Sequence, residues 1–98
     1  MRSSDAIALI KQRINIVELI NRFVPLKQVG SRFVAPCPFH EETKPSFSVN
    51  PDGYFYCFGC QKHGDIFDFW MEYHGVTFRE ALNQLAEMAN VTVDETDR

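Results

Sequence analysis

The chain has 98 residues, which suits one small domain but not two. With 45% hydrophobic and 23% charged residues it has a globular composition, and no apolar run approaches the ~20 residues of a transmembrane helix. The net charge of −3 argues against a tight, purely electrostatic nucleic-acid binder. Residues 1–64 carry eight Lys and Arg against five Asp and Glu, whereas residues 65–98 carry two against eight. Any nucleic acid should therefore bind to the first two thirds of the chain.

The start of the chain and its cysteine count indicate the cellular compartment of the protein. Residues 1–11 contain no apolar segment followed by a small-residue cleavage site, so they do not form a signal peptide. Three cysteines would leave one thiol over in any disulfide framework. We therefore expect a cytoplasmic protein that does not contact a membrane and whose cysteines bind a metal.

Residues 5–24 are expected to be helical, because apolar residues recur there at three- and four-residue spacing. Asn15, with Glu18 three residues later, has the form of a helix N-cap, which predicts two short helices rather than one. Pro25 ends the second helix.

Residues 26–63 show the pattern of strands. The sequence Gly30-Ser31 predicts a turn between strands over residues 26–29 and 32–35. A second turn at residues 50–53 separates strands over residues 46–49 and 54–56. Phe47 and Val49 alternate with serines, which predicts a sheet with one buried face.

Helices return at residues 65–90. Asp65 is a candidate N-cap of a helix that ends at Gly75. Thr77 and Glu80 form a capping box that opens a second helix to about residue 89. Residues 94–98 are expected to be a frayed tail or the start of a linker.

Four residues have the spacing of a structural zinc site: Cys37, His40, Cys57 and Cys60. They form two pairs, each with two residues between its members, and 16 residues separate the pairs. Two ligands at this spacing reach one ion from a tight turn whose amides point at the sulfurs, and structural zinc prefers four tetrahedral N/S ligands. Such a closed site leaves no position for a catalytic water, so no metal catalysis is predicted.

Three other interpretations of these residues compete with a Cys3His zinc site. Cys57 and Cys60 could form a redox dithiol, but such motifs usually open a helix in a βαβ unit, whereas these flanks read as strands and turns. An iron–sulfur cluster is compatible with thiolates. His63 could replace His40 as the fourth ligand, but His40 completes the first pair. The interpretation we favour is one α+β domain over residues 1–98, a zinc ribbon whose small antiparallel sheet is flanked by N-terminal and C-terminal helices.

The sequence resembles the N-terminal zinc-binding domain of bacterial DnaG-type primases, the CHC2 zinc finger. The resemblance runs from about Asp5 to Val93 and rests on the strings CPFH at 37–40, TKPSF at 43–47, YCFGC at 56–60 and HGD at 63–65. One departure is Gln61, where members of that family often carry glycine.

The resemblance implies a function for the domain. The family domain holds single-stranded template DNA and supports the initiation of RNA primer synthesis. Its polymerase site, which uses magnesium, lies in a separate following domain, and a further C-terminal region meets the replicative helicase. This chain would then be a piece of a longer primase or a detached domain, with the primase polymerase core as a partner and no catalytic activity of its own.

Single-strand binders combine cations with aromatic faces on which bases stack. The candidate DNA-binding residues are Lys27, Arg32, Phe33, Lys44, Tyr56, Phe58, Lys62 and His63. Among the aromatic residues we expect Phe33, Tyr56 and Phe58 to be exposed, and Phe47 and Phe55 to be core. Four cations predict weak binding in isolation.

Two further functions compete with DNA binding. The acidic residues after position 64 would suit a ribbon that acts as a protein–protein adaptor, although a solvated helix face also explains them. A redox or metal-storage protein would survive thiol oxidation with its fold intact, which a zinc-nucleated domain should not.

Overall fold

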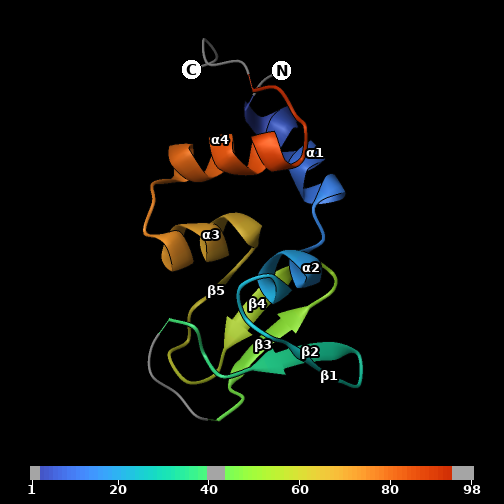
Figure 1. Cartoon of the computed structure of the whole chain (residues 1–98), viewed down its shortest axis with the longest axis vertical. Helices are drawn as coiled ribbons and strands as arrows, with labels where there is room; N and C mark the ends of the chain where they lie inside the picture. Colours follow the sequence, from blue (N-terminus) through green and yellow to red (C-terminus); the bar gives the residue numbers. More distant parts are fainter. Residues whose placement is uncertain (1–2, 40–43, 94–98) are drawn as a thin grey trace.

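The computed structural model describes residues 3–39 and 44–93, in which two helices, five strands and two more helices follow one another. Figure 1 shows three levels along the 44 Å long axis: the sheet, then α2 and α3, then α1 and α4. The predicted α+β class, a small antiparallel sheet flanked by helices, is confirmed. Among the described residues, no helix is both long enough and apolar enough to cross a membrane.

The N-terminal helices are separate, as Asn15 predicts. Helix α1 spans Ser3–Arg13 and α2 spans Ile16–Asn21. The Asn15 side-chain oxygen accepts hydrogen bonds from the amides of Val17 and Glu18, at 2.8 and 3.2 Å. This cap occupies amides that the first turn of α2 leaves without partners, and an N-cap of this kind contributes about 1 kcal/mol.

The five strands pair antiparallel in sequence order. Their bounds are β1 Lys27–Val29, β2 Arg32–Ala35, β3 Phe47–Asn50, β4 Tyr54–Cys57 and β5 His63–Gly64. The two predicted hairpins are confirmed, since β1 pairs with β2 and β3 pairs with β4. No sequence pattern predicts β5, because two residues are too few to show alternation.

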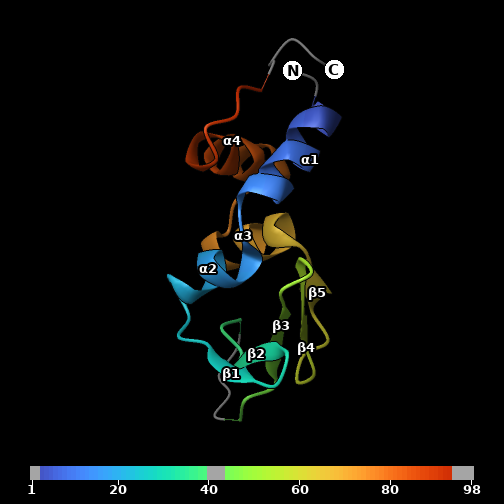
Figure 2. The same cartoon turned by 90° about the vertical axis from the view of Figure 1, so that its right-hand side faces the viewer.

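The pairing register assigns side chains to the two faces of the sheet. Cross-strand neighbours share a face, so Phe33, Val49 and Phe55 lie together, and so do Ala35, Phe47 and Cys57. This covered face is largely buried, and the α3 residue Phe69 packs against it with its ring centroid 6.3 Å from that of Phe55. Figure 2 shows α2 and α3 between the sheet and the outer pair of helices.

Helices α3, Ile66–His74, and α4, Phe78–Met88, each begin with a capping box. Asp65 and Asp68 form the first box, and Thr77 and Glu80 form the second. Gly75 ends α3 with φ of 66°, a left-handed conformation that suits glycine. The predicted helix boundaries in this region are therefore confirmed to within one residue.

Two contacts tie α1 to the C-terminal helices. The Lys11 ammonium lies 2.7 Å from the Asp65 carboxylate, at the start of α3. The Arg13 guanidinium donates to the carbonyls of Ala89 and Asn90, at 3.2 and 3.1 Å. A cation at this point satisfies carbonyls that the C-terminal end of α4 leaves free.

Candidate metal centre and nucleic-acid interface

The three cysteines come together at one end of the sheet. Cys37 follows β2, Cys57 ends β4, and Cys60 lies in the turn after it. Their sulfurs all lie within 4.8 Å of one another, and the Cys37 and Cys60 sulfurs are 3.6 Å apart. A tetrahedral zinc ion with Zn–S bonds of about 2.3 Å places its sulfurs about 3.8 Å apart. The thiol cluster therefore fits a structural zinc ion.

Backbone amides in both turns point at the sulfurs, as the spacing predicts. Burial raises the pKa of the Cys37 thiol to about 12, although the Phe39 amide donates to its sulfur and opposes that rise. Burial also acts to raise the pKa of Cys57, but hydrogen bonds from the Cys60 amide, the neighbouring thiols and the Gly59 amide lower it to about 6. These donors favour thiolate, the form that binds metal.

The fourth ligand predicted from the sequence, His40, lies outside the described residues. His63, the competing candidate, is described and lies apart from the thiols. Its Nδ1 is 3.2 Å from the Gln61 carbonyl oxygen, and its ring stacks on Tyr56. Within residues 3–39 and 44–93, the cluster of possible metal ligands contains the three cysteines and no histidine.

An aromatic cluster connects the metal centre to the core. Phe39, between the first pair of ligand positions, has its ring centroid 5.8 Å from those of Phe47 and Phe55 and 6.0 Å from that of Phe69. Cys57 is fully buried and lies opposite Phe47 in the sheet. Because the metal-binding turns and the core share these side chains, loss of the metal should loosen both.

The other face of the sheet, which we call the open face, carries polar, cationic and aromatic side chains. One row crosses all five strands, through Lys27, Val34, Ser48, Tyr56 and His63. With strands about 4.8 Å apart, this row is about 19 Å long.

Most of the predicted DNA-binding residues lie on or beside the open face. Arg32 shares this face with Val34, two residues along β2. Phe58 follows β4, is 64% exposed, and has its ring centroid 4.8 Å from that of Tyr56. Lys44 is exposed in the segment before β3.

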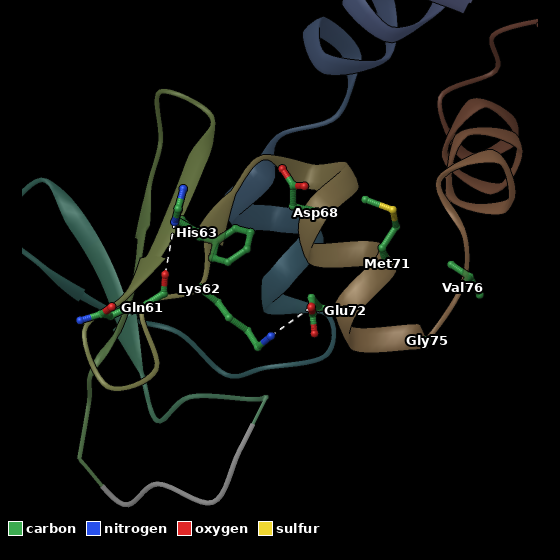
Figure 3. Close-up of a pocket in the computed structure, with 9 residues that line it drawn as sticks. Gln61, Lys62, His63, Asp68, Met71, Glu72, Gly75 and Val76 are labelled. Carbon is green, nitrogen blue, oxygen red and sulfur yellow. Dashed lines mark hydrogen bonds and ion pairs between the residues drawn. The ribbon is translucent and has the colours of Figure 1, made fainter.

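Two of the predicted DNA-binding residues are placed differently. Phe33 was expected to be exposed but lies opposite Val49 on the covered face, half-buried against the core, so that expectation is wrong. The Lys62 ammonium forms an ion pair with Glu72 of α3, at 3.0 Å. Figure 3 shows this pair beside a hollow of about 570 Å³ between the β5 edge and α3.

Tyr54 is a site candidate that the sequence reasoning missed. It lies two residues before Tyr56, on the same face of β4, and is 50% exposed. The same alternation that separates Phe55 from Tyr56 would have placed it on the open face. Phe47 and Phe55 are fully buried, as predicted.

The model of one protein family, the CHC2 zinc finger, matches residues 2–98. The chain belongs to this family. It is 38% identical over 97 residues to a DNA primase of Campylobacter jejuni and 46% identical over 88 residues to one of Thermotoga maritima. These alignments cover 98% and 89% of this chain but only 16% of each relative.

A solved structure supports the same assignment. The chain is similar to the Aquifex aeolicus primase, whose crystal structure holds zinc-binding and RNA polymerase domains, with a TM-score of 0.88 and 34% identity. The similarity covers 95% of this chain and 23% of the Aquifex chain. Membership in the CHC2 zinc finger family and the cysteine cluster together identify zinc as the structural cofactor.

The structure also explains why Gln61 stands out from the family pattern. Gln61 adopts φ of 64°, the left-handed conformation in which glycine carries no steric cost. Its amide donates to the Cys57 carbonyl at 2.7 Å, which closes the turn that holds Cys60. The position therefore favours glycine for backbone reasons, and glutamine occupies it at some strain.

Proposed function

We propose that this chain is the template-binding zinc domain of a bacterial DNA primase and that it supports the initiation of RNA primer synthesis in the cytoplasm. The observation that carries the proposal is the open face. Cationic and aromatic side chains are interleaved there on a sheet whose strand ends carry the metal ligands. Single-strand binders of low sequence preference use this combination.

The zinc ion supplies a cross-link and no reaction step. Cys37, Cys57 and Cys60, with His40 as the proposed fourth ligand, would close its coordination shell. Three thiolates outweigh the charge of Zn²⁺, so the site itself does not attract phosphate. Its effect on DNA is indirect, because the ligand-bearing turns fix the ends of β2 and β4 and hence the side chains of the open face.

The remaining parts of a primase would lie outside this chain, which spans 14–18% of the length of the relatives it matches. Polymerisation with magnesium belongs to a separate polymerase core in this proposal, and contact with the replicative helicase belongs to the longer protein. The domain would bind template weakly alone and more strongly when the core holds the same strand, by effective concentration.

The competing function is that of a protein–protein adaptor. The described part of α3 and α4 carries Asp68, Glu72, Glu80 and Glu87 against one cation, Arg79. Such a surface would repel a DNA strand and suit a basic protein partner.

Titration of the zinc-loaded chain with labelled single-stranded DNA at low salt separates the two functions. We expect saturable binding whose logarithm falls with the logarithm of salt concentration. Arg32→Ala on the open face should weaken binding and reduce the salt slope by about 0.7. Arg79→Ala on α4 is the matched control and should leave both unchanged. Absence of binding by the folded, zinc-loaded chain would favour the adaptor.

A further inference from the structure

Three aromatic side chains follow one another along β4 on the open face of the sheet. They are Tyr54, Tyr56 and Phe58, at every second position of the chain. The Phe58 amide donates to the Ser46 carbonyl at 2.8 Å, so the pairing of β3 with β4 continues for one residue beyond Cys57. Because Cys57 lies on the covered face, Phe58 lies on the open face. We call Tyr54, Tyr56 and Phe58 the β4 aromatic stripe.

The rings of the stripe are accessible and held in place. Tyr54 is 50% exposed, Tyr56 36% and Phe58 64%. The Tyr54 hydroxyl oxygen accepts a hydrogen bond at 2.9 Å from the side-chain amide of Asn50, which lies opposite it on β3. The rings of Tyr56 and Phe58 contact each other, with centroids 4.8 Å apart. These contacts restrict the rings before any ligand binds, so less conformational freedom is lost when a base stacks on them.

The spacing of the stripe suits an unstacked single strand. Residues two apart on a β-strand are separated by about 6.8 Å, at about 3.4 Å per residue. This distance is twice the rise of about 3.4 Å between stacked nucleotides along one strand of a duplex. Bases that lie over successive rings of the stripe are therefore unstacked from one another, and each stacks on a ring instead. A duplex would have to melt to do the same.

Cations lie to one side of the stripe, on β1 and β2. Lys27 is in the same cross-strand row as Tyr56, three strands away and thus at about 14 Å. Arg32 lies two residues before Val34 on β2, which puts it in the next row, the row of Tyr54, at about 10 Å. The five described strands contain no acidic residue. A strand whose bases lie over the stripe can therefore turn its phosphates toward these two cations.

The side chains on the open face distinguish two paths for such a strand. A path across the sheet passes from Tyr56 to Ser48 and Val34 before it reaches Lys27. Ser48 and Val34 carry neither a charge nor a ring on which a base can stack. A path along β4 meets a ring at every second residue, and each base–ring contact adds to the affinity.

We infer that the single strand runs along β4, over the β4 aromatic stripe, and not across the strands of the sheet. Successive bases stack on Tyr54, Tyr56 and Phe58, and the phosphates face β2 and β1. The inference rests on the proposed function. It adds the path of the strand and a DNA contact at Tyr54.

A spin label on the DNA tests the path without changing the protein. The ¹⁵N-labelled, zinc-loaded chain is mixed at low salt with an oligo(dT) of about four nucleotides, the short end of the range for single-strand sites, that carries a nitroxide at its 5′ end. Gly53 and Tyr54 lie at one end of the stripe, and Phe58 and Gly59 at the other. We expect the amides at one end to broaden most, and those at the other end when the nitroxide is moved to the 3′ end. Broadening centred on β1 or β5, or equal at both ends of the stripe, would overturn the path.

Removal of single rings gives a second test. Tyr54→Leu and Phe58→Leu each keep apolar bulk and remove one ring. Each should lower the affinity for oligo(dT) by about 5-fold or more in fluorescence anisotropy at low salt, the effect of one lost base–ring contact. Phe78→Leu at the start of α4 is the matched control, since this ring is 43% exposed, and it should leave the affinity unchanged. Circular dichroism and zinc content establish that each variant is folded.

The outcomes separate the inference from the proposed function. Full affinity in both Tyr54→Leu and Phe58→Leu overturns the path along β4 and leaves the proposed function standing. A loss in only one of the two variants overturns the three-ring path. Failure of the folded, zinc-loaded and unmodified chain to bind the strand overturns the proposed function together with the inference.

Discussion

Gly64 is a position where the structure predicts a large effect of adding a single methyl group. Its φ of 150° lies in a region that side-chain-bearing residues rarely adopt. A Cβ built on Gly64 would also overlap the Cβ and carboxylate of Asp68. The Asp68 Cβ is fixed by the backbone of α3, so a change of rotamer cannot relieve the overlap.

The expected loss of stability in Gly64→Ala follows from the backbone strain and the overlap with Asp68. Backbone strain of this kind costs about 1–3 kcal/mol, and overpacking costs about 1–3 kcal/mol more. Gly64→Ala should therefore lower the free energy of unfolding by about 2–6 kcal/mol, with a midpoint of about 4 kcal/mol. At about 4–8 °C per kcal/mol for a domain of this size, that midpoint corresponds to a fall in Tm of about 16–32 °C.

Gly53→Ala provides the control. Gly53 also has positive φ, at 122°, but a Cβ there would meet nothing within 4 Å. It should cost only the strain, about 1–3 kcal/mol, without the overpacking. Urea denaturation and thermal melts of the two zinc-loaded variants give the comparison. If Gly64→Ala is no less stable than Gly53→Ala, the argument from the β5–α3 contact is refuted.

Three further predictions concern charge and backbone strain. Glu72→Gln should release Lys62 from its ion pair, raise single-stranded DNA affinity a few-fold and steepen the salt slope by about 0.7, measured by anisotropy. Burial acts to raise the pKa of Asp65, but the ion pair with Lys11 and hydrogen bonds with Asp68 bring this pKa below its usual value. The Asp65 carboxylate therefore stabilises the fold above about pH 4, and this contribution is lost as the pH falls further. Lys11→Met should accordingly cost about 0.5 kcal/mol at pH 7 in urea denaturation, and the difference from the unmodified chain should vanish in acid. Gln61→Gly should relieve the strain of the left-handed backbone and leave the free energy of unfolding unchanged or raised by up to about 0.5 kcal/mol. A loss above about 1 kcal/mol in urea denaturation would contradict the claim that Gln61 is strained.

Features set by neighbouring residues along the chain could be predicted from the sequence. Asn15, Asp65 and Thr77 cap their helices as expected, because a capping box depends on residues three apart. The cysteine pairs predicted the thiol cluster for the same reason, since each pair lies within one turn.

Features set by contacts between distant segments could not be predicted. The face on which Phe33 lies depends on its register with Val49 in β3, which the β1–β2 hairpin alone does not fix. The Lys62–Glu72 ion pair depends on the packing of β5 against α3, ten residues later in the chain. The hollow between the β5 edge and α3 depends in turn on β5, which is too short to leave a pattern in the sequence.

The central claim is that the zinc-held open face binds single-stranded DNA. The most direct test is a titration of the ¹⁵N-labelled, zinc-loaded chain with a short single strand at low salt, followed by ¹H–¹⁵N correlation spectra. The account predicts shifts of the amides of β1, β2, β4 and β5, with α4 unchanged, and their loss when a chelator removes the zinc. Shifts confined to α3 and α4, or no shifts in a folded and zinc-loaded chain, would contradict it.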